Sequence, residues 1–172
     1  MQEAVDTVAH LMAIAATTAP KGKGEDFLEL KVLVGEDKDN IAEDMIKIAG
    51  ERGIPNFKRD GDNVRDSQAI LLIGLKDHKG AGLNCKACGF EGCKEFDAAK
   101  AEGDFSGPNC SIRLLDLGIA LGSAVKTASI HNVDNRIMYR AGVSAVRLGI
   151  MQSNIVMGVP LSVSSKSIFF DR

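Results

Sequence analysis

The chain has 172 residues, of which 45% are hydrophobic and 26% are charged, and its formal net charge at pH 7 is -2. This balance is that of a globular protein and excludes the disordered and fibrous classes. The small net charge excludes a general attraction to nucleic acid or to an anionic membrane. No apolar run approaches the roughly 18–20 residues that span a bilayer, and the N-terminus has no signal-peptide pattern. We therefore expect a cytoplasmic protein with no nucleic-acid and no membrane partner.

Helices and strands alternate along the predicted chain. In order, the pattern predicts a helix over 3–19, a strand over 27–35, a helix over 39–53, a strand over 69–75, a helix over 111–129, a helix over 134–149, a strand over 154–161 and an edge strand over 167–170. Pro20 ends the first helix and Gly53 ends the second. Because the alternation lacks strict β-α-β regularity, it predicts an α+β fold, with one domain over residues 1–172.

Two of these segments are apolar almost throughout. The run AILLIGL (69–75) is typical of a strand that is buried on both faces. The helix over 111–129 is apolar nearly all round, which predicts that it is buried. Gly118 and Gly122 would form a flat stripe on this helix, which another helix or a ligand could approach closely.

Four cysteines carry the clearest chemical signal in the chain. Cys85, Cys88, Cys93 and Cys110 follow the spacing C-x2-C-x4-C-x16-C, and the chain has no other cysteine. In a reducing compartment such a cluster indicates metal ligands, whereas a disulfide framework would spread its cysteines along the chain. Segment 84–111 is therefore predicted to be a metal-binding insertion.

Spacing favours an iron–sulfur cluster over zinc in this segment. A structural zinc site commonly pairs two short C-x2-C units, and only Cys85 and Cys88 have that form. Iron–sulfur sites commonly take three ligands from a compact loop and the fourth from elsewhere, as Cys110 would supply it here. Gly89 and Gly92 let the loop wrap closely around an anionic cluster. Structural zinc, and a cluster that never changes its oxidation state, remain the alternatives.

The cysteine segment resembles the small four-iron four-sulfur domain of corrinoid iron–sulfur proteins and electron-transport subunits. The shared features are Cys88-Gly89, Phe96 two residues after the third cysteine, the Ala-rich stretch 98–103 and the last cysteine. That family usually places Pro directly after the last cysteine, where this chain has Ser111. The resemblance implies a [4Fe-4S] cluster and covers about a sixth of the chain.

Over its whole length the chain resembles a prokaryotic family of uncharacterised proteins with a ferredoxin domain. The segments that carry this likeness are TAPKGKG (18–24), NVDNRIMYRAG (132–142) and VMGVPLS (156–162), together with the cysteine motif. A weaker likeness is to FMN-dependent nitroreductases, through Ala19-Pro20 and the terminal strand sequence GVPL (158–161). The arginine-rich phosphate segment and the Asn-x-Gln-Pro-Trp segment of nitroreductases are missing. This likeness implies a nitroreductase-like fold, a homodimer and a possible FMN site.

The residues that could hold a flavin or another anion form three groups. Lys21 and Lys23 flank glycines after the first helix, where a glycine loop can wrap around phosphate. Arg136 and Arg140 are four residues apart and would share one helical face, which Arg113 could approach. Gly118 and Gly122 would offer a flat face to the isoalloxazine. Solvated surface positions or ion pairs are the alternative reading of the four cations.

No hydrolytic constellation is present, since His10, His78 and His131 are scattered along the chain. Asp77 and His78 precede the cysteines closely enough to tune a cluster, and an exposed turn is the alternative. The leading functional hypothesis is a redox protein that passes electrons to a redox partner protein or a small-molecule electron acceptor. The second hypothesis is a non-catalytic protein in which a structural metal braces an interaction module.

Overall fold

The computed structural model describes residues 1–170. Its helices and strands, in chain order, are α1 (Gln2–Thr18), a 3-10 turn (Gly22–Gly24), β1 (Leu28–Val34), α2 (Gly35–Arg52), α3 (Pro55–Asp66), β2 (Ala69–Leu75), α4 (Cys93–Ala98), α5 (Ser111–Ile130), β3 (Asp134–Asn135), α6 (Tyr139–Arg147) and β4 (Ile155–Ser162). The strands form one sheet in the order β1-β2-β4-β3, and every neighbouring pair is antiparallel.

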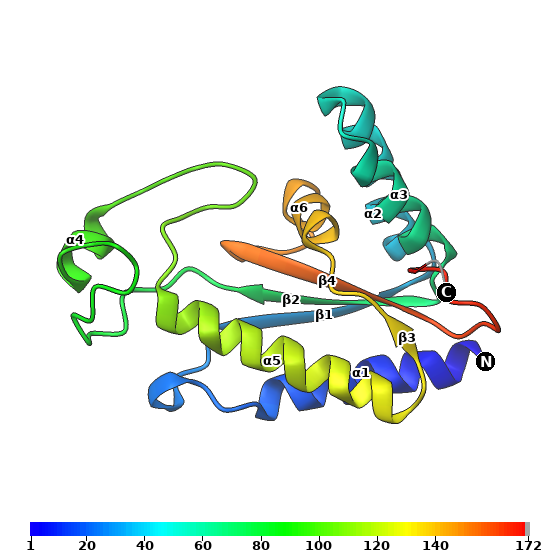
Figure 1. Cartoon of the computed structure of the whole chain (residues 1–172), viewed down its shortest axis with the longest axis horizontal. Coiled ribbons are helices and arrows are strands. Elements are labelled where there is room, and N and C mark those ends of the chain that lie inside the picture. The colour runs from blue at the N-terminus through cyan, green and yellow to red at the C-terminus, as the bar shows by residue number, and fades with distance from the viewer. Residues whose placement is uncertain (171–172) are drawn as a thin grey trace.

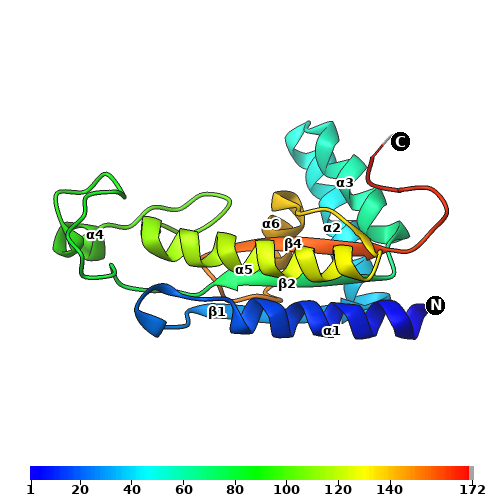
Figure 2. The same cartoon turned by 60° about the horizontal axis from the view of Figure 1, so that its bottom comes forward.

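Two helical layers enclose this sheet (Figures 1 and 2). Helices α1 and α5 pack on each other and on one face, and α2, α3 and α6 cover the opposite face. Alternate residues of β2 point to the two layers: Leu71 and Ile73 join the core under α1 and α5, whereas Ile70 and Leu72 join the other core. The continuous apolar run of β2 is therefore explained by burial on both faces, as its sequence predicted.

Helix α6 lies against β4 at backbone distance. A Cβ built on Gly142 would lie 1.7 Å from the carbonyl oxygen of Val156. Beside this contact, Met138 and Gly158 exchange two backbone hydrogen bonds, of 2.7 and 3.0 Å. The glycines in the two sequence segments 132–142 and 156–162 thus serve the close packing of one helix on one strand.

Most predicted elements are confirmed. The α+β class is also confirmed, because helices pack on an antiparallel sheet. The strand 69–75 has the predicted bounds, α5 differs from prediction by one residue at one end, and α1, β1 and β4 differ by one residue at each end. Helix α2 begins four residues before its predicted start and ends before Gly53, which has the predicted left-handed conformation. Helix α3 was missed. It begins with Pro55 and buries only a narrow stripe that includes Phe57 and Val64.

Three predictions about the second half of the chain are wrong. The helix predicted over 134–149 begins only at Tyr139, because residues 134–135 pair with β4 as a short strand. Residues 167–170 form no edge strand: 168–170 are bends, and Phe169 is buried in the core under α2. Helix α5 is buried on one side only, since Leu115 and Ile119 are 61% and 46% exposed in the single chain.

Within residues 1–170, no helix combines the length and the apolar character that crossing a membrane requires.

Candidate functional site

The cysteine segment projects beyond the end of the sheet, between β2 and α5 (Figure 1). All four cysteines line one cavity there. The other lining residues come from this segment, as Phe96 does, or from the residues just before it, as Gly80 and Leu83 do. Cys85 is exposed, Cys88 and Cys93 are half-buried, and Cys110 is buried. The fold thus brings the distant fourth cysteine to the three cysteines of the loop.

The cysteine loop is curled by residues in the left-handed conformation. Asn84, Lys86 and Gly89 have φ angles of 46°, 59° and 84°. The side-chain oxygen Oδ1 of Asn84 accepts a hydrogen bond from the backbone N–H of Cys93 at 3.0 Å. Left-handed turns of this kind form the concave backbone surfaces that bind anions. The local conformation therefore suits a negatively charged group held by the thiolates.

The connection from β2 to the cysteine loop packs against the third cysteine. A Cβ on Gly80 would lie 2.9 Å from Cβ and 3.1 Å from Sγ of Cys93, so a larger residue would displace that side chain. The backbone N–H of Gly80 donates to Oδ1 of Asp97 at 2.7 Å. Gly80 is therefore held against the beginning of α4, where Cys93 lies.

Cys110 is the residue immediately before α5, and its carbonyl oxygen accepts from the N–H of Leu114 at 2.9 Å. Its thiol belongs to a small apolar cluster beneath the loop, composed of Ala81, Cys88, Phe90, Phe96, Cys110 and Ile112. This cluster joins the cysteine segment to α5. The helix N-terminus beside Cys110 favours negative charge at that thiol.

The donor set around the cavity consists of four soft thiols. Thiolates of this number are the ligands of [4Fe-4S] clusters and of tetrahedral zinc. Within residues 1–170, no group of three or more His, Cys, Asp or Glu side chains is arranged to hold a single metal ion. The four cysteines around the shared cavity match the donor set of a [4Fe-4S] cluster in number and type.

The segment that returns from α4 to α5 is fixed to the body of the protein through Asp104. Its carboxylate accepts from Arg52 in α2 and from the hydroxyl of Tyr139 in α6, both at 2.5 Å. These two bonds, first that of Tyr139 and then that of Arg52, lower the pKa of Asp104. Burial and the bond to Asp104 raise the pKa of Tyr139 to about 12. The approach to Cys110 is therefore anchored on α2 and α6.

The two lysines of the glycine loop after α1 both bond to backbone carbonyl oxygens of the same chain. Lys21 is nearly buried, and its ammonium donates to the carbonyl oxygens of Ala16 and Thr17 at the end of α1. The ammonium of Lys23 lies 3.4 Å from the carbonyl oxygen of Ala81, beside the cysteine loop. Lys21 thus caps α1, and Lys23 connects the glycine loop to the cysteine segment.

Arg113 lies in a buried network that sequence reasoning missed. It is 2% exposed, and its guanidinium donates to the carbonyl oxygen of Gly22 and to the carboxylates of Glu25 and Asp116. Asp116 in turn accepts from the N–H of Gly22 at 2.7 Å. The spacing of Arg113 and Asp116 by three residues, facing one side of a helix, is the only sequence signal for this pair. Arg113 therefore orders the glycine loop on α5 and does not approach Arg136 or Arg140.

Arg136 and Arg140 do not share a helical face, because Arg136 precedes α6. Arg140 pairs with the buried carboxylate of Asp60 in α3 at 2.8 Å, and Arg136 lies near the backbone of Phe169. Arg140 and Arg136 thus contact the layer of α2, α3 and α6, whereas Lys21 bonds to the end of α1, which covers the other face of the sheet. One chain therefore does not gather these four cations around one anion.

Gly118 and Gly122 lie on the exposed side of α5. A Cβ at either position would meet no atom of the chain within 4 Å. Packing within the chain therefore does not require glycine there, although each glycine costs a helix about 1 kcal/mol relative to alanine. Together with Leu115 and Ile119 they form a stripe along one helix face, which we name the α5 stripe.

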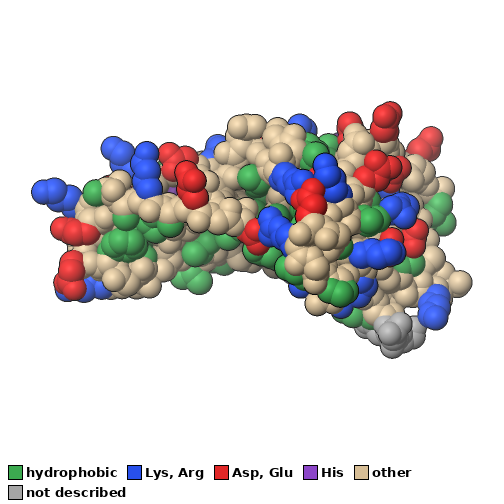
Figure 3. Space-filling view, turned by 90° about the horizontal axis from the view of Figure 1, so that it is seen from above, with side chains coloured by type: hydrophobic (Ala, Val, Ile, Leu, Met, Phe, Trp, Pro, Cys, Tyr) green, Lys and Arg blue, Asp and Glu red, His purple; other side chains and the backbone are tan. Residues whose placement is uncertain are grey.

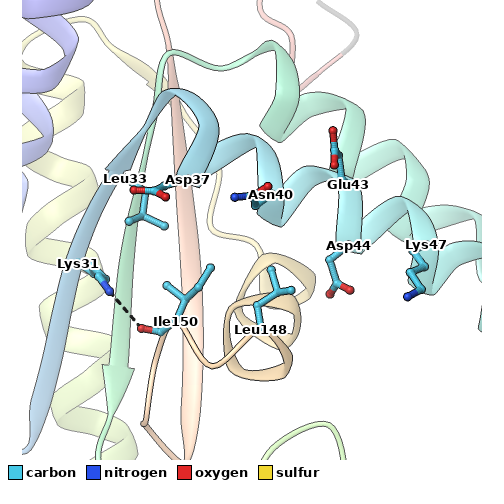
Figure 4. Close-up of a pocket in the computed structure, with 9 residues that line it drawn as sticks. All are labelled: Lys31, Leu33, Asp37, Asn40, Glu43, Asp44, Lys47, Leu148 and Ile150. Carbon is cyan, nitrogen blue, oxygen red and sulfur yellow. Dashed lines mark hydrogen bonds between the residues drawn. The ribbon is translucent and has the colours of Figure 1, made fainter.

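A second concavity lies over the edge strand β1 (Figure 4). Its volume is about 660 Å³, and its lining comes from β1, α2 and the loop after α6: Lys31, Leu33, Asp37, Asn40, Glu43, Asp44, Lys47, Leu148 and Ile150. The ammonium of Lys31 lies 3.4 Å from the carbonyl oxygen of Ile150 across it. None of the site residues predicted from the sequence lines this concavity.

Charged side chains of both signs are interspersed on the face formed by α2, α3 and α6 (Figure 3). This agrees with the small net charge of the chain.

Sequence comparison finds one relative over almost the whole chain and one family match over residues 106–172. An uncharacterized protein from Archaeoglobus fulgidus is 52% identical over 171 residues, which cover 99% of this chain and 92% of that protein. Residues 106–172 match the family described as "uncharacterized protein containing a ferredoxin domain (DUF2148)". That match includes the fourth cysteine, Cys110.

Solved structures with a similar fold include FMN enzymes. A nitroreductase from Desulfitobacterium hafniense with bound FMN aligns with a TM-score of 0.60 and 14% identity, over 94% of this chain and 79% of that chain. An FMN-dependent nitroreductase from Mycobacterium smegmatis, in complex with NADPH, gives a TM-score of 0.57 and 11% identity, over 92% and 78%. At these identities the likeness shows the fold alone, and it confirms the predicted nitroreductase-like fold.

Proposed function

Since the chain belongs to the family of proteins containing a ferredoxin domain, we propose that it is a cytoplasmic redox protein that binds one [4Fe-4S] cluster. The ligands in this proposal are Cys85, Cys88, Cys93 and Cys110. The observation that carries it is the shared cavity: the fold brings Cys110 to the three loop cysteines, although sixteen residues separate it from Cys93.

A bound cluster would supply reversible transfer of single electrons. The chain contributes the four thiolates, the left-handed turns at Asn84 and Lys86, and the apolar cluster that excludes water beneath the loop. Cys85 is the exposed ligand, so electrons would enter or leave at this end of the molecule. The partner is a redox protein or a small-molecule electron acceptor that reaches this surface.

The dimer belongs to the same proposal. Leu115 and Ile119 expose apolar surface along the α5 stripe, and Gly118 and Gly122 permit close approach without serving any contact in the single chain. Exposed apolar helix faces of this kind are commonly covered by an identical surface across a two-fold axis. We therefore expect a homodimer built on α5.

FMN is a second proposed cofactor, supported by the fold and by the open glycine positions. In this arrangement the isoalloxazine lies against Gly118 and Gly122 at the dimer interface. Of the two loop cations, Lys23 is the one we assign to the flavin phosphate, because the ammonium of Lys21 is bound to the end of α1. Arg136 or Arg140 could contribute only from the partner subunit, since they lie across the sheet in the same chain.

An anaerobic absorption spectrum with iron, sulfide, zinc and flavin analysis of one sample tests the proposal. The expected result is a brown protein with four iron and four sulfide per chain that bleaches with dithionite. A colourless protein with one zinc per chain would establish the structural-metal alternative. Titration with FMN tests the second cofactor. A dissociation constant above about 1 mM, which corresponds to a binding free energy of about 4 kcal/mol, would leave the cluster as the sole proposed cofactor.

A further inference from the structure

His78 is bound through both ring nitrogens to backbone groups, one of which belongs to Cys110. The backbone N–H of Cys110 lies 3.0 Å from Nε2 of His78, and Nδ1 lies 2.8 Å from the carbonyl oxygen of Lys76. An amide N–H can only donate and a carbonyl oxygen can only accept. Nε2 must therefore be the acceptor and Nδ1 must carry the proton, so the two partners select one tautomer.

The ring is also fixed by its neighbours. It stacks on Phe96 with a centroid distance of 6.1 Å and an interplanar angle of 27°, and it lies 6.2 Å from the ring of Phe27. Phe96 belongs to α4 and lines the cysteine cavity, whereas Phe27 directly precedes β1. These contacts hold the imidazole between the sheet and the cysteine segment.

The backbone to which His78 is tied is part of the sheet. The N–H of Lys76 donates to the carbonyl oxygen of Phe27 at 2.8 Å, which extends the pairing of β1 and β2 by one bond. A series of contacts thus runs from the end of β2 through the ring to Cys110, the residue before α5. Cys110 is the one cysteine that lies outside the loop, and these contacts set its position relative to the loop.

We propose that His78 is a positioning residue for the cluster. By accepting the Cys110 N–H in its Nδ1–H tautomer, it holds the fourth thiolate in register with Cys85, Cys88 and Cys93. This inference rests on the proposed function. Replacing a residue that hydrogen-bonds to a metal ligand typically lowers metal affinity about 10–100-fold.

Two variants separate the hydrogen bond from the ring contacts. His78→Phe keeps a flat ring between Phe27 and Phe96 and removes the acceptor. His78→Gln places an amide oxygen near the position of Nε2 and restores the acceptor without the ring. His10→Phe is the matched control, because Nδ1 of His10 also bonds a backbone carbonyl, that of Asp6 at 2.8 Å, and this bond lies within α1, outside the cysteine segment.

The main measurement is the rate of iron release to a chelator under anaerobic conditions. We expect His78→Phe to release iron at least about 10-fold faster than wild type, His78→Gln to return toward the wild-type rate, and His10→Phe to match it. The electron paramagnetic resonance spectrum of the reduced cluster should change in His78→Phe and recover in His78→Gln. Equal rates in wild type and His78→Phe, or no recovery in His78→Gln, would overturn the inference.

Nuclear magnetic resonance of the metal-free protein gives a measurement that does not need the variants to fold. Two-bond proton–nitrogen correlations should show the Nδ1–H tautomer of His78, and the opposite tautomer would overturn the inference. If wild type holds no iron, the proposed function fails and the inference fails with it. If wild type holds the cluster and the variants do not differ, only the inference fails.

Discussion

The hydroxyl of Tyr139 donates a hydrogen bond of 2.5 Å to Oδ2 of Asp104, and Arg52 donates to the other oxygen of the same carboxylate. The edge of the Phe105 ring meets the Tyr139 ring at a centroid distance of 5.3 Å. The segment between α4 and Cys110 is thereby joined to two helices of the main body, and the position of the cysteine segment depends on this junction.

Titration of Tyr139 can be read directly, because it is the only tyrosine and the chain has no tryptophan. Absorbance at the phenolate band near 295 nm should give a midpoint near pH 12 rather than 10. Asp104→Asn should lower this midpoint but leave it above 10, because burial is the largest cause of the shift and the Asp104 bond is the second. Circular dichroism at each pH verifies that the protein remains folded.

The same pair predicts how stability depends on pH. The folded pKa of Tyr139 lies above its ordinary value, so its contribution to stability is complete below pH 10 and is lost as the pH rises through about 12. The folded pKa of Asp104 is lowered, so its contribution is present above 3.8 and is lost as the pH falls through the folded pKa. Tyr139→Phe should flatten the alkaline loss in urea unfolding. An unchanged alkaline slope would contradict this assignment.

Replacing any loop cysteine with serine should abolish stable cluster binding. A hydroxyl is a much poorer ligand for soft metals than a thiolate, and Cys85, Cys88 and Cys93 supply most of the chelation. Iron per chain after anaerobic reconstitution is the measurement. Leu83→Ser is the matched control, because Leu83 lines the same cavity without offering sulfur. Unchanged iron content in all three cysteine variants would refute the ligand assignment.

A charge in the α5 stripe should prevent dimer formation. Ile119→Glu places a carboxylate in a surface that is apolar and 46% exposed in the single chain, so burying it against a second copy becomes unfavourable. Light scattering at micromolar concentration should give a dimer mass for wild type and a monomer mass for the variant. Ile54→Glu, at an exposed position between α2 and α3, should remain a dimer. A monomer mass for wild type would remove the proposed dimer.

The contact between α6 and β4 should be intolerant of any side chain at Gly142. Gly142→Ala would place its methyl group 1.7 Å from the carbonyl oxygen of Val156, which forces the helix off the strand. We expect a loss of about 3 kcal/mol or more in the free energy of unfolding. Gly50→Ala, in α2 with no atom within 4 Å, should instead gain up to about 1 kcal/mol. Urea unfolding of both variants measures the difference.

The local sequence pattern was sufficient to predict those elements whose apolar spacing or end residues are characteristic by themselves. The run of β2, the turn at Gly53 and the one-residue accuracy of α5 follow from apolar spacing and glycine chemistry, which act over a few residues. The assignment of segment 84–111 as a metal-binding segment likewise rests on cysteine spacing, because ligand type and loop length are properties of the sequence, and it stays a prediction. Helix α3 escaped because its buried stripe is narrow and most of its residues are polar.

The sequence by itself determined most elements of the two layers, α3 excepted, together with the cysteine set and the likeness to a nitroreductase fold. Tertiary structure alone decided the partners of the charged and titratable groups. Lys21 caps a helix, Arg113 orders the glycine loop and His78 accepts from Cys110, and the last two contacts cross 91 and 32 residues of chain. The physical reason is range: spacing along a helix or strand fixes which face a side chain shares, whereas its hydrogen-bond partner depends on which distant segment the fold brings against that face.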